Sequence, residues 1–515
     1  MKAESAIDEF RQLLGDQRVI TGEPELREWR DPFSFATWNE YTASAVIKPA
    51  TVEEIQKVVR IAGRHGVPLW THSQGRNNGY GGPAPRVKGS VIVSLRDMNR
   101  VLEINEECAY AVVEPGVRWF DLYEEIRAGD HKLMLSVADI GWGSVIGNTL
   151  DNGITYMPYG QDQMMQCGME VVLANGEVLR TGMGAMPNNR SWHVYKRGLG
   201  PTPDQLFMQS NYGIVTKMGV WLLPYPEVFM PVWVRVWHDD DLAAVLDTLR
   251  RLMLEGTVRG VPQVLNTVLY TSMFTTRDQW WQGEGPIPDG RIEEMAREFD
   301  CGRWLLRCAL YGDEPTVDHG FEKIKAAYGA IPGAEIWGAK CAPEDIPELE
   351  NPHERVMGGV PSLDLNQMVA WYGGEEGGHI AFSPIAPLTG RDGFALRDLL
   401  RGMVEEAGLD YMASLLPVSA RSFSHITMII YDRTNEQQVT SAFEVCKTLV
   451  RKAAELGYGE YRAHLDFMDL AAEQYSWNDH AYMRFCETIK DAIDPHGILA
   501  PGKQGIWPRS MRQSG

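Results

Sequence analysis

The sequence predicts an α+β protein of two domains. Three observations lead to this prediction: the length of 515 residues, an N-terminal part with mixed helix and strand signals, and a later part in which alternating strands are followed by amphipathic helices. A chain of this length exceeds the ~250–300 residues at which one hydrophobic core stops growing, so two domains are expected. The hydrophobic fraction, 44%, is ordinary for a globular protein.

The N-terminal part, up to about residue 220, carries signals for both helices and strands. Residues 1–16 have the pattern of an amphipathic helix, and Thr51 to Glu54 form a capping box that begins a second helix, which Gly63 and Gly66 end. Asn175-Gly176 predicts a hairpin turn between strands at 171–173 and 178–179. The other elements expected here are strands over 67–73, 90–95 and 109–114 and a helix over 117–128.

From Met230 onward the pattern predicts an antiparallel sheet backed by helices. Valines alternate with larger or polar residues over 232–237, and leucines then recur at helical spacing over 242–252. Prolines at 224 and 226 mark the expected boundary between the domains. The polar stretch 329–361 is expected to be a surface excursion. Similar strand and helix signals return over 303–310, 320–328, 370–383, 394–407, 411–416, 426–431 and 437–456.

Charge and cysteine usage exclude several classes of protein. With 69 acidic and 49 basic side chains the net charge is −20, which repels nucleic acid and anionic lipid. The first sixteen residues lack the layout of a secretory signal, and no stretch approaches a membrane span. None of the seven cysteines forms a CxxC pair, so reduced thiols and a cytoplasmic location are expected.

Two glycine-rich segments are candidates for binding phosphate. Residues 74–82 contain four glycines and two asparagines beside Arg76, and a second glycine-rich loop is expected over 141–149. Backbone N–H groups in such loops can form an anion-binding nest, although either loop alone is equally well a plain turn. A G-x-G-x-x-G fingerprint is absent, which argues against a Rossmann domain.

A few polar residues lie in settings that suit a flavin pocket acting on phenols. His379 lies on a short strand that follows two glycines, while Tyr80, Asp139 and the pair Tyr461-Arg462 come from distant segments. Each residue alone is as well explained as a core histidine, a packed tyrosine or a turn residue. His72, His425 and His464 show no metal-ligand spacing with carboxylates, so no metal site is expected.

Six segments together resemble the 4-phenol oxidising branch of the vanillyl-alcohol oxidase/p-cresol methylhydroxylase flavoprotein family, and are most similar to eugenol oxidase-like enzymes. They are HSQGRNNGYGG, ADIGWGSVIGNTLDNG, QSNYGIVTKMG, GGHIAFSP, GYGEYRAH and DPHGILAPGKQGIW. The resemblance implies a non-Rossmann FAD-binding domain made of residues 1–225 and 461–515, with a substrate-covering cap domain at 226–460. It also implies a homodimer or a higher homo-oligomer.

The resemblance assigns roles to individual residues. His379 resembles the histidine that bonds covalently to the 8α-methyl group of FAD, whereas relatives coupled to a cytochrome use a tyrosine. Tyr80, Tyr461 and Arg462 resemble the trio that binds the substrate as a phenolate, and Asp139 resembles the acidic residue beside flavin N5. The residues expected to bind the cofactor are His379, Ser73, Gly75, Arg76, Asn77, Asn78, Gly79, Gly147, Asn148, Thr149, Ile214, Val215, Arg462 and Lys503.

The expected function is therefore an FAD-dependent oxidase of 4-substituted phenols. Hydride is expected to leave the benzylic carbon for flavin N5, to give a p-quinone methide, with molecular oxygen reduced to hydrogen peroxide. One alternative is a cytochrome-coupled 4-alkylphenol dehydrogenase of the same family. Another is a flavin-binding protein without catalysis. The residues leave open which para substituent and methoxy pattern is preferred.

Overall fold

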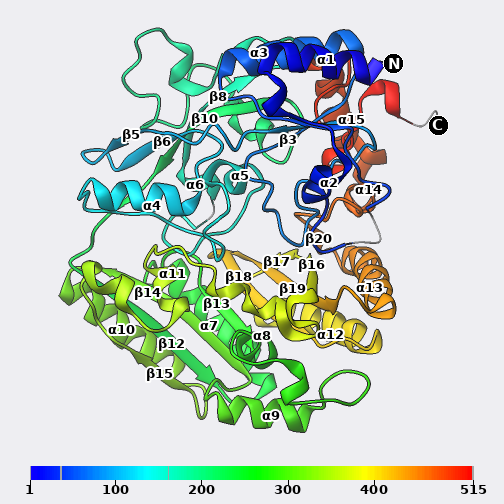
Figure 1. The fold of residues 1–515 in the computed structure, drawn as a ribbon. Coiled ribbons are helices and arrows are strands. Elements are labelled where there is room, and N and C mark those ends of the chain that lie inside the picture. The colour runs from blue at the N-terminus through cyan, green and yellow to red at the C-terminus, as the bar shows by residue number, and fades with distance from the viewer. Residues whose placement is uncertain (1, 35–37, 161, 513–515) are drawn as a thin grey trace.

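A computed structural model of the chain describes residues 2–34, 38–160 and 162–512. Figure 1 shows two lobes. The N-terminal lobe holds the beginning of the chain, in blue and cyan, together with its end, in red. The central lobe holds the middle of the chain, in green to orange. The predicted two-domain α+β architecture is confirmed.

The first sheet of the N-terminal lobe has four strands. They are β1 (Val19–Ile20), β2 (Ala45–Ile47), β4 (Val91–Ser94) and β3 (Leu69–His72), in that order, and the last three run parallel. Helices α1 (Lys2–Leu14) and α3 (Val52–His65) share one hydrophobic core with this sheet. As predicted, α3 begins at Thr51, whose side chain accepts a hydrogen bond from the Glu54 N–H, and ends at Gly66 in the left-handed conformation.

The second sheet of this lobe is antiparallel. Its five strands are β5 (Val101–Asn105), β6 (Tyr110–Val113), β10 (Ile214–Trp221), β8 (Gln166–Val172) and β9 (Val178–Arg180), in that order. The hairpin predicted at Asn175-Gly176 is present, and Gly176 has a φ of 80°. Helix α4 (Trp119–Ala128) packs into the core of this region, as predicted.

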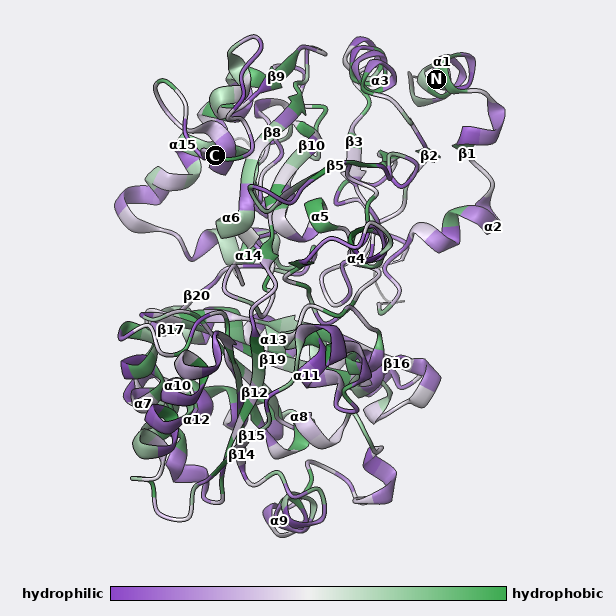
Figure 2. Ribbon diagram, turned by 90° about the vertical axis from the view of Figure 1, so that its left-hand side faces the viewer, coloured by the Kyte–Doolittle hydropathy of each residue, from purple (hydrophilic) through white to green (hydrophobic). Residues whose placement is uncertain are grey.

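The central lobe is built on a nine-stranded antiparallel sheet, which confirms the prediction for residues after 230. Helices α7 (Leu242–Leu254), α10 (Glu314–Tyr328), α12 (Gly390–Glu406) and α13 (Glu436–Glu455) share its main core. Figure 2 shows green, hydrophobic strands inside and purple, polar segments on the peripheral helices. The order is β15 (Glu335–Gly338), β12 (Val228–Val236), β14 (Trp304–Gly312), β13 (Gln263–Asn266), β18 (Met412–Ser419), β19 (Ser422–Asp432), β17 (Pro384–Pro387) and β20 (Gly459–Glu460), with β16 (Gly377–Phe382) paired to β19.

After β20 the chain returns to the N-terminal lobe through α14 (Met468–Glu473) and α15 (Trp477–Ile493). There the Leu69 N–H of β3 donates to the carbonyl of Ile498, at 2.7 Å, and the Ala500 N–H donates to the carbonyl of Leu69, at 2.8 Å. The end of the chain therefore pairs with a strand near its beginning. The domain limits at residues 225 and 460 stay predictions. The strand before residue 225 is β11 (Leu223–Pro224), which pairs with β7 (Leu133–Met134), and the strand after it is β12.

Two predictions about local structure were wrong. Residues 145–150 of the predicted second loop form helix α5 (Val145–Leu150), because the Ser144 hydroxyl caps it by accepting from the Gly147 N–H, at 2.9 Å. The stretch 329–361 is not only a surface excursion, since it supplies the edge strand β15 and helix α11 (Pro352–Met357). Within α11, His353, Val356 and Met357 are buried. No helix in the described ranges has the length and apolar character needed to span a membrane.

Candidate active site

A cavity in the N-terminal lobe brings most of the predicted cofactor residues together. Its walls come from the turn after β3, the N-terminus of α5, the segment before β10 and the C-terminal residues 499, 500 and 503. Asn78, Gly79, Thr149, His379, Tyr461 and Asp139 do not line this cavity. The predicted residues that do are Ser73, Gly75, Arg76, Asn77, Tyr80, Gly147, Asn148, Ile214, Val215, Arg462 and Lys503.

Glycines allow the two sides of the cavity to approach each other. Gly75 has a φ of 65°, and a Cβ atom placed on Gly147 would overlap the hydroxyl of Ser73. Four buried polar atoms of lining residues have no hydrogen-bond partner within the described part of the protein: His72 Nε2, Ser210 Oγ, Asn211 Oδ1 and Arg462 Nε. Buried polar atoms are normally satisfied, so these atoms and the glycine-lined walls fit a bound polar cofactor such as FAD.

Thr149 is one of the predicted cofactor residues that do not line the cavity. Its side chain is buried, and its hydroxyl donates to the carbonyl of Val145 within α5, at 2.9 Å. This bond keeps the hydroxyl on the helix backbone. The predicted contact of the Thr149 side chain with the cofactor therefore finds no support in the geometry of the cavity.

His379 lies on β16, where it pairs with Ile430 of β19. The side chain is buried, its Nδ1 atom has no hydrogen-bond partner in the protein, and the ring of Phe33 lies 5.0 Å away. A Cβ atom on Gly79 would overlap Nε2, so the imidazole packs directly on the backbone of the glycine-rich loop. Burial lowers the pKa of His379 to about 4, which keeps the imidazole neutral and nucleophilic at neutral pH.

Tyr80 and Arg462 are in direct contact. The Arg462 guanidinium lies 4.3 Å from the centre of the Tyr80 ring, and the Tyr80 hydroxyl lies 3.4 Å from the Ser383 hydroxyl. Burial raises the pKa of both Tyr80 and Tyr461, and Arg462 acts against it. The two phenols therefore stay protonated hydrogen-bond donors beside a half-buried cation, an arrangement suited to an anionic oxygen. We call Tyr80, Tyr461 and Arg462 the phenol clamp.

Asp151 links Arg462 to Lys503. Its carboxylate lies 3.0 Å from the Lys503 ammonium group and 3.8 Å from the Arg462 guanidinium, which also donates to the Asn77 side chain. Burial would raise the pKa of Asp151, but Lys503 and Arg462 outweigh it and hold the pKa below its usual value. Lys503 is thus an ion-paired wall residue. Asp151 was missed by the sequence reasoning, although it stands in the quoted segment GNTLDNG.

Asp139 is held by two residues that the sequence reasoning also missed. Its Oδ2 atom accepts a hydrogen bond from the Tyr156 hydroxyl, and the Arg307 guanidinium of β14 lies 3.6 Å from its Oδ1 atom. Arg307 is fully buried and donates to Gln263 at 2.5 Å and to the His353 carbonyl at 2.9 Å. Enclosure by protein raises the pKa of Asp139, while Arg307 and Tyr156 oppose the rise. Tyr156 and Arg307 thus fix the position of the carboxyl group, and its raised pKa brings it closer to the range in which a carboxyl group exchanges protons as a general base.

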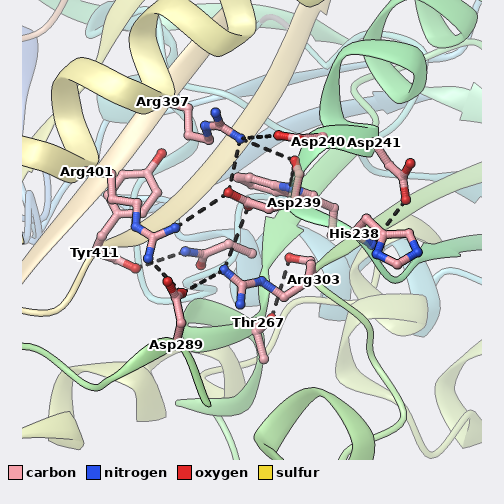
Figure 3. A network of polar contacts seen from close by, with 12 residues as sticks. His238, Asp239, Asp240, Asp241, Thr267, Asp289, Arg303, Arg397, Arg401 and Tyr411 are labelled. Atoms are coloured by element: carbon pink, nitrogen blue, oxygen red, sulfur yellow. Dashed lines mark hydrogen bonds and ion pairs between the residues drawn. The ribbon is translucent and has the colours of Figure 1, made fainter. Parts of the chain in front are cut away.

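A second polar cluster, in the central lobe, has a structural explanation. Figure 3 shows Arg303, Arg397 and Arg401 directed at Asp239 and Asp289. The separations are 3.0 Å for Arg397 to Asp239, 2.8 Å for Arg401 to Asp289 and 3.1 Å for Arg303 to Asp289. Each arginine thus has a carboxylate within the cluster, which crosslinks α12, the residue before β14 and the start of α9 (Asp289–Glu298). In the ranges that the structure describes, no group of acidic, histidine and cysteine side chains has the arrangement of a metal site.

Comparison with known proteins decides the family. The family described as "FAD binding domain" matches residues 43–182, and "FAD linked oxidases, C-terminal domain" matches residues 422–504. Over 503 residues the chain is 36% identical to the "4-cresol dehydrogenase [hydroxylating] flavoprotein subunit" of Pseudomonas putida, which covers 97% of this chain and 95% of that protein. The chain belongs to the vanillyl-alcohol oxidase/p-cresol methylhydroxylase family. It is an FAD-dependent oxidoreductase of this phenol-oxidising family, as predicted.

Two solved structures within the family have the same fold across nearly the whole chain. The isoeugenol complex of 4-ethylphenol oxidase from Gulosibacter chungangensis has a TM-score of 0.95 and 38% identity, covering 99% of this chain and 98% of that one. The p-cresol methylhydroxylase structure with substrate bound has a TM-score of 0.92 and 35% identity, covering 98% and 97%. One of these relatives is named an oxidase, whereas the curated Pseudomonas relative is named a dehydrogenase. The electron acceptor therefore stays a prediction.

Proposed function

We propose that the protein is an oxidase of 4-substituted phenols that holds FAD covalently through His379 and uses molecular oxygen as its acceptor. The observation that carries the proposal is the phenol clamp. The half-buried guanidinium of Arg462 lies against the Tyr80 ring and follows Tyr461 in the chain, and Tyr80 and Arg462 both line the cavity of the cofactor loops. When bound, FAD supplies the acceptor for the hydride that leaves the benzylic carbon, which turns the phenolate into a p-quinone methide.

The clamp makes the substrate ready for that loss. Arg462 and the hydroxyls of Tyr80 and Tyr461 favour the ionised phenol, because charge-assisted hydrogen bonds are stronger to an anion than to a neutral hydroxyl. The negative charge spreads through the ring to the para carbon. Methyl ethers of good substrates cannot ionise and are expected not to reduce the flavin. Equal turnover of an ether and its free phenol would contradict the proposal.

Asp139 acts after the hydride has left. Its carboxylate, held by Tyr156 and Arg307, takes a proton from the water that adds to the quinone methide.

Tyr461→Phe and Arg462→Ala, which change the phenol clamp, are expected to slow anaerobic flavin reduction by phenols, measured by stopped-flow absorbance. Unchanged rates in both variants would remove these residues from the mechanism.

The covalent bond is supported by the place of His379. Its imidazole is neutral, buried and packed on the glycine-rich loop, and its Nδ1 atom has no partner in the protein. Acid precipitation of the holoenzyme is expected to give a yellow, fluorescent pellet, and the pellet of His379→Ala is expected to be colourless. His319→Ala, which changes an exposed histidine of α10, is the matched control and should keep the colour. A yellow pellet from His379→Ala would refute the linkage.

Oxygen as acceptor follows from the histidine, because the resemblance ties a tyrosine linkage to relatives that use a cytochrome. The alternative is a cytochrome-coupled dehydrogenase, which the name of the Pseudomonas relative favours. Mixing the reduced enzyme with oxygen in a stopped-flow instrument separates the two. Slow reoxidation by oxygen together with fast reoxidation by a cytochrome would favour the dehydrogenase. If no phenol bleached the flavin anaerobically, the protein would be a flavin-binding protein without this catalysis.

A further inference from the structure

Glu460 is a buried acidic residue that the mechanism above does not use. It lies on the edge strand β20, opposite Pro384 of β17, and directly precedes Tyr461 and Arg462 of the phenol clamp. One carboxyl oxygen, Oε2, accepts a hydrogen bond from the Ser383 N–H at 2.9 Å. The other, Oε1, accepts from the Arg462 N–H at 3.2 Å. Both oxygens are therefore engaged by backbone donors.

These two donors belong to opposite sides of the clamp. Ser383 follows β16, the strand of His379, and its hydroxyl lies 3.4 Å from the Tyr80 hydroxyl. Arg462 is the cation of the clamp. We propose that Glu460 is a positioning residue, whose carboxyl group fixes the distance between the Tyr80 side and the Arg462 side of the clamp and carries a proton while a phenolate is bound. This inference rests on the proposed function.

The electrostatic setting supports the protonated form. Burial raises the pKa of Glu460 to about 8, while the two N–H groups and Arg462 act against the rise. Below that pH the carboxyl is neutral; above it the carboxylate adds a negative charge beside the bound phenolate. The affinity for a phenolate is therefore expected to fall as the pH rises through the pKa of Glu460. The titratable groups that interact electrostatically with Glu460 are Tyr80, Cys446, Tyr461, Arg462 and Tyr475.

The test uses 4-nitrophenol with the holoenzyme. This phenol is yellow when ionised and has no benzylic hydrogen, so its binding and its ionisation are read by difference absorbance without turnover. The wild type is expected to bind it as the phenolate, with an affinity that falls above pH about 8. Glu460→Gln keeps the size of the side chain but leaves one N–H without an oxygen acceptor. Its affinity is expected to be about tenfold weaker at neutral pH, and the fall in affinity above pH about 8 is expected to be absent.

Two further variants complete the test. Glu473→Gln makes the same chemical change on the exposed end of α14 and should bind 4-nitrophenol as the wild type does. Glu460→Asp keeps a titrating carboxyl group on a shorter side chain, so weaker binding that still falls with pH is expected. If Glu460→Gln does not yield holoenzyme, Glu460→Asp becomes the test of the role of Glu460. Wild-type affinity for 4-nitrophenol in Glu460→Asp would then overturn the inference.

The outcomes separate this inference from the proposed function. Wild-type affinity and wild-type pH dependence in Glu460→Gln would overturn the role of Glu460 and leave the phenol clamp intact. A wild type that did not bind 4-nitrophenol as its anion would refute the clamp itself, and the role of Glu460 with it.

Discussion

Replacement of Lys490 by methionine is expected to destabilise the N-terminal lobe by about 3 kcal/mol. Lys490 lies on α15 with no exposed surface, and its ammonium group contacts the Asp494 carboxylate at 2.7 Å and the carbonyls of Asn211 and Leu499 at 2.8 and 2.6 Å. Breaking a buried ion pair from one side costs about 3–5 kcal/mol, because the remaining charge has no counterion. The low end applies, since Asp494 keeps the N–H donors of Ile498 and Leu499.

Urea unfolding followed by tryptophan fluorescence measures this loss of stability. The slope of the unfolding free energy against urea concentration is expected to be the same for Lys490→Met and the wild type. The double variant Lys490→Met/Asp494→Leu removes both charges and is expected to be less destabilised than the single variant. Lys447→Met breaks the solvent-exposed pair with Glu444 on α13 and should change stability by less than about 0.5 kcal/mol. If Lys490→Met unfolded at the same urea concentration as Lys447→Met, the reasoning about the buried pair would be wrong.

Two other substitutions test the site. Gly79→Ala is expected to lower the content of covalent flavin, measured by absorbance after acid precipitation, because the new methyl group overlaps the imidazole of His379. Gly89→Ala has a similar φ of 83° but open space around it, and should keep the flavin content; equal losses in both would point to backbone strain alone. Arg307→Met removes the cation beside Asp139, so Asp139 should hold its proton to higher pH. The acid limb of the pH profile for product hydration is then expected to move to higher pH, and an unmoved limb would argue against Asp139 as the base.

The parts of the site that could be predicted from the sequence are those whose residues lie close together in the chain. The turn over 73–77 and the segment GYGEYRAH, through Arg462, each bring functional groups to the cavity. Glycine spacing and flanking residues are enough to recognise such segments. The helices and strands with strong periodicity, such as α3 and β12, were predicted for the same reason.

Contacts that depend on the pairing of distant strands were not predicted. Arg307 reaches its partners because β14 pairs with β13 in a register that places it opposite Gln263, and no local pattern encodes that register. One signal was available: Arg307 is the only charged residue in the apolar run from Trp304 to Leu310. A charged side chain in a buried strand needs a partner, and here that partner is Asp139. Helix α5 was missed because glycine and asparagine within it weaken the helical pattern.

The parallel pairing of Leu69 with Leu499 has a consequence for biosynthesis. One part of the cavity wall consists of residues 499, 500 and 503, whereas the turn over 73–77 on the same cavity is translated about four hundred residues earlier. A nascent polypeptide that has emerged only as far as α15 has the glycine loops but an open side. The cavity is complete only after this late segment has been synthesised, so we expect stable binding of the cofactor to follow the synthesis of Lys503.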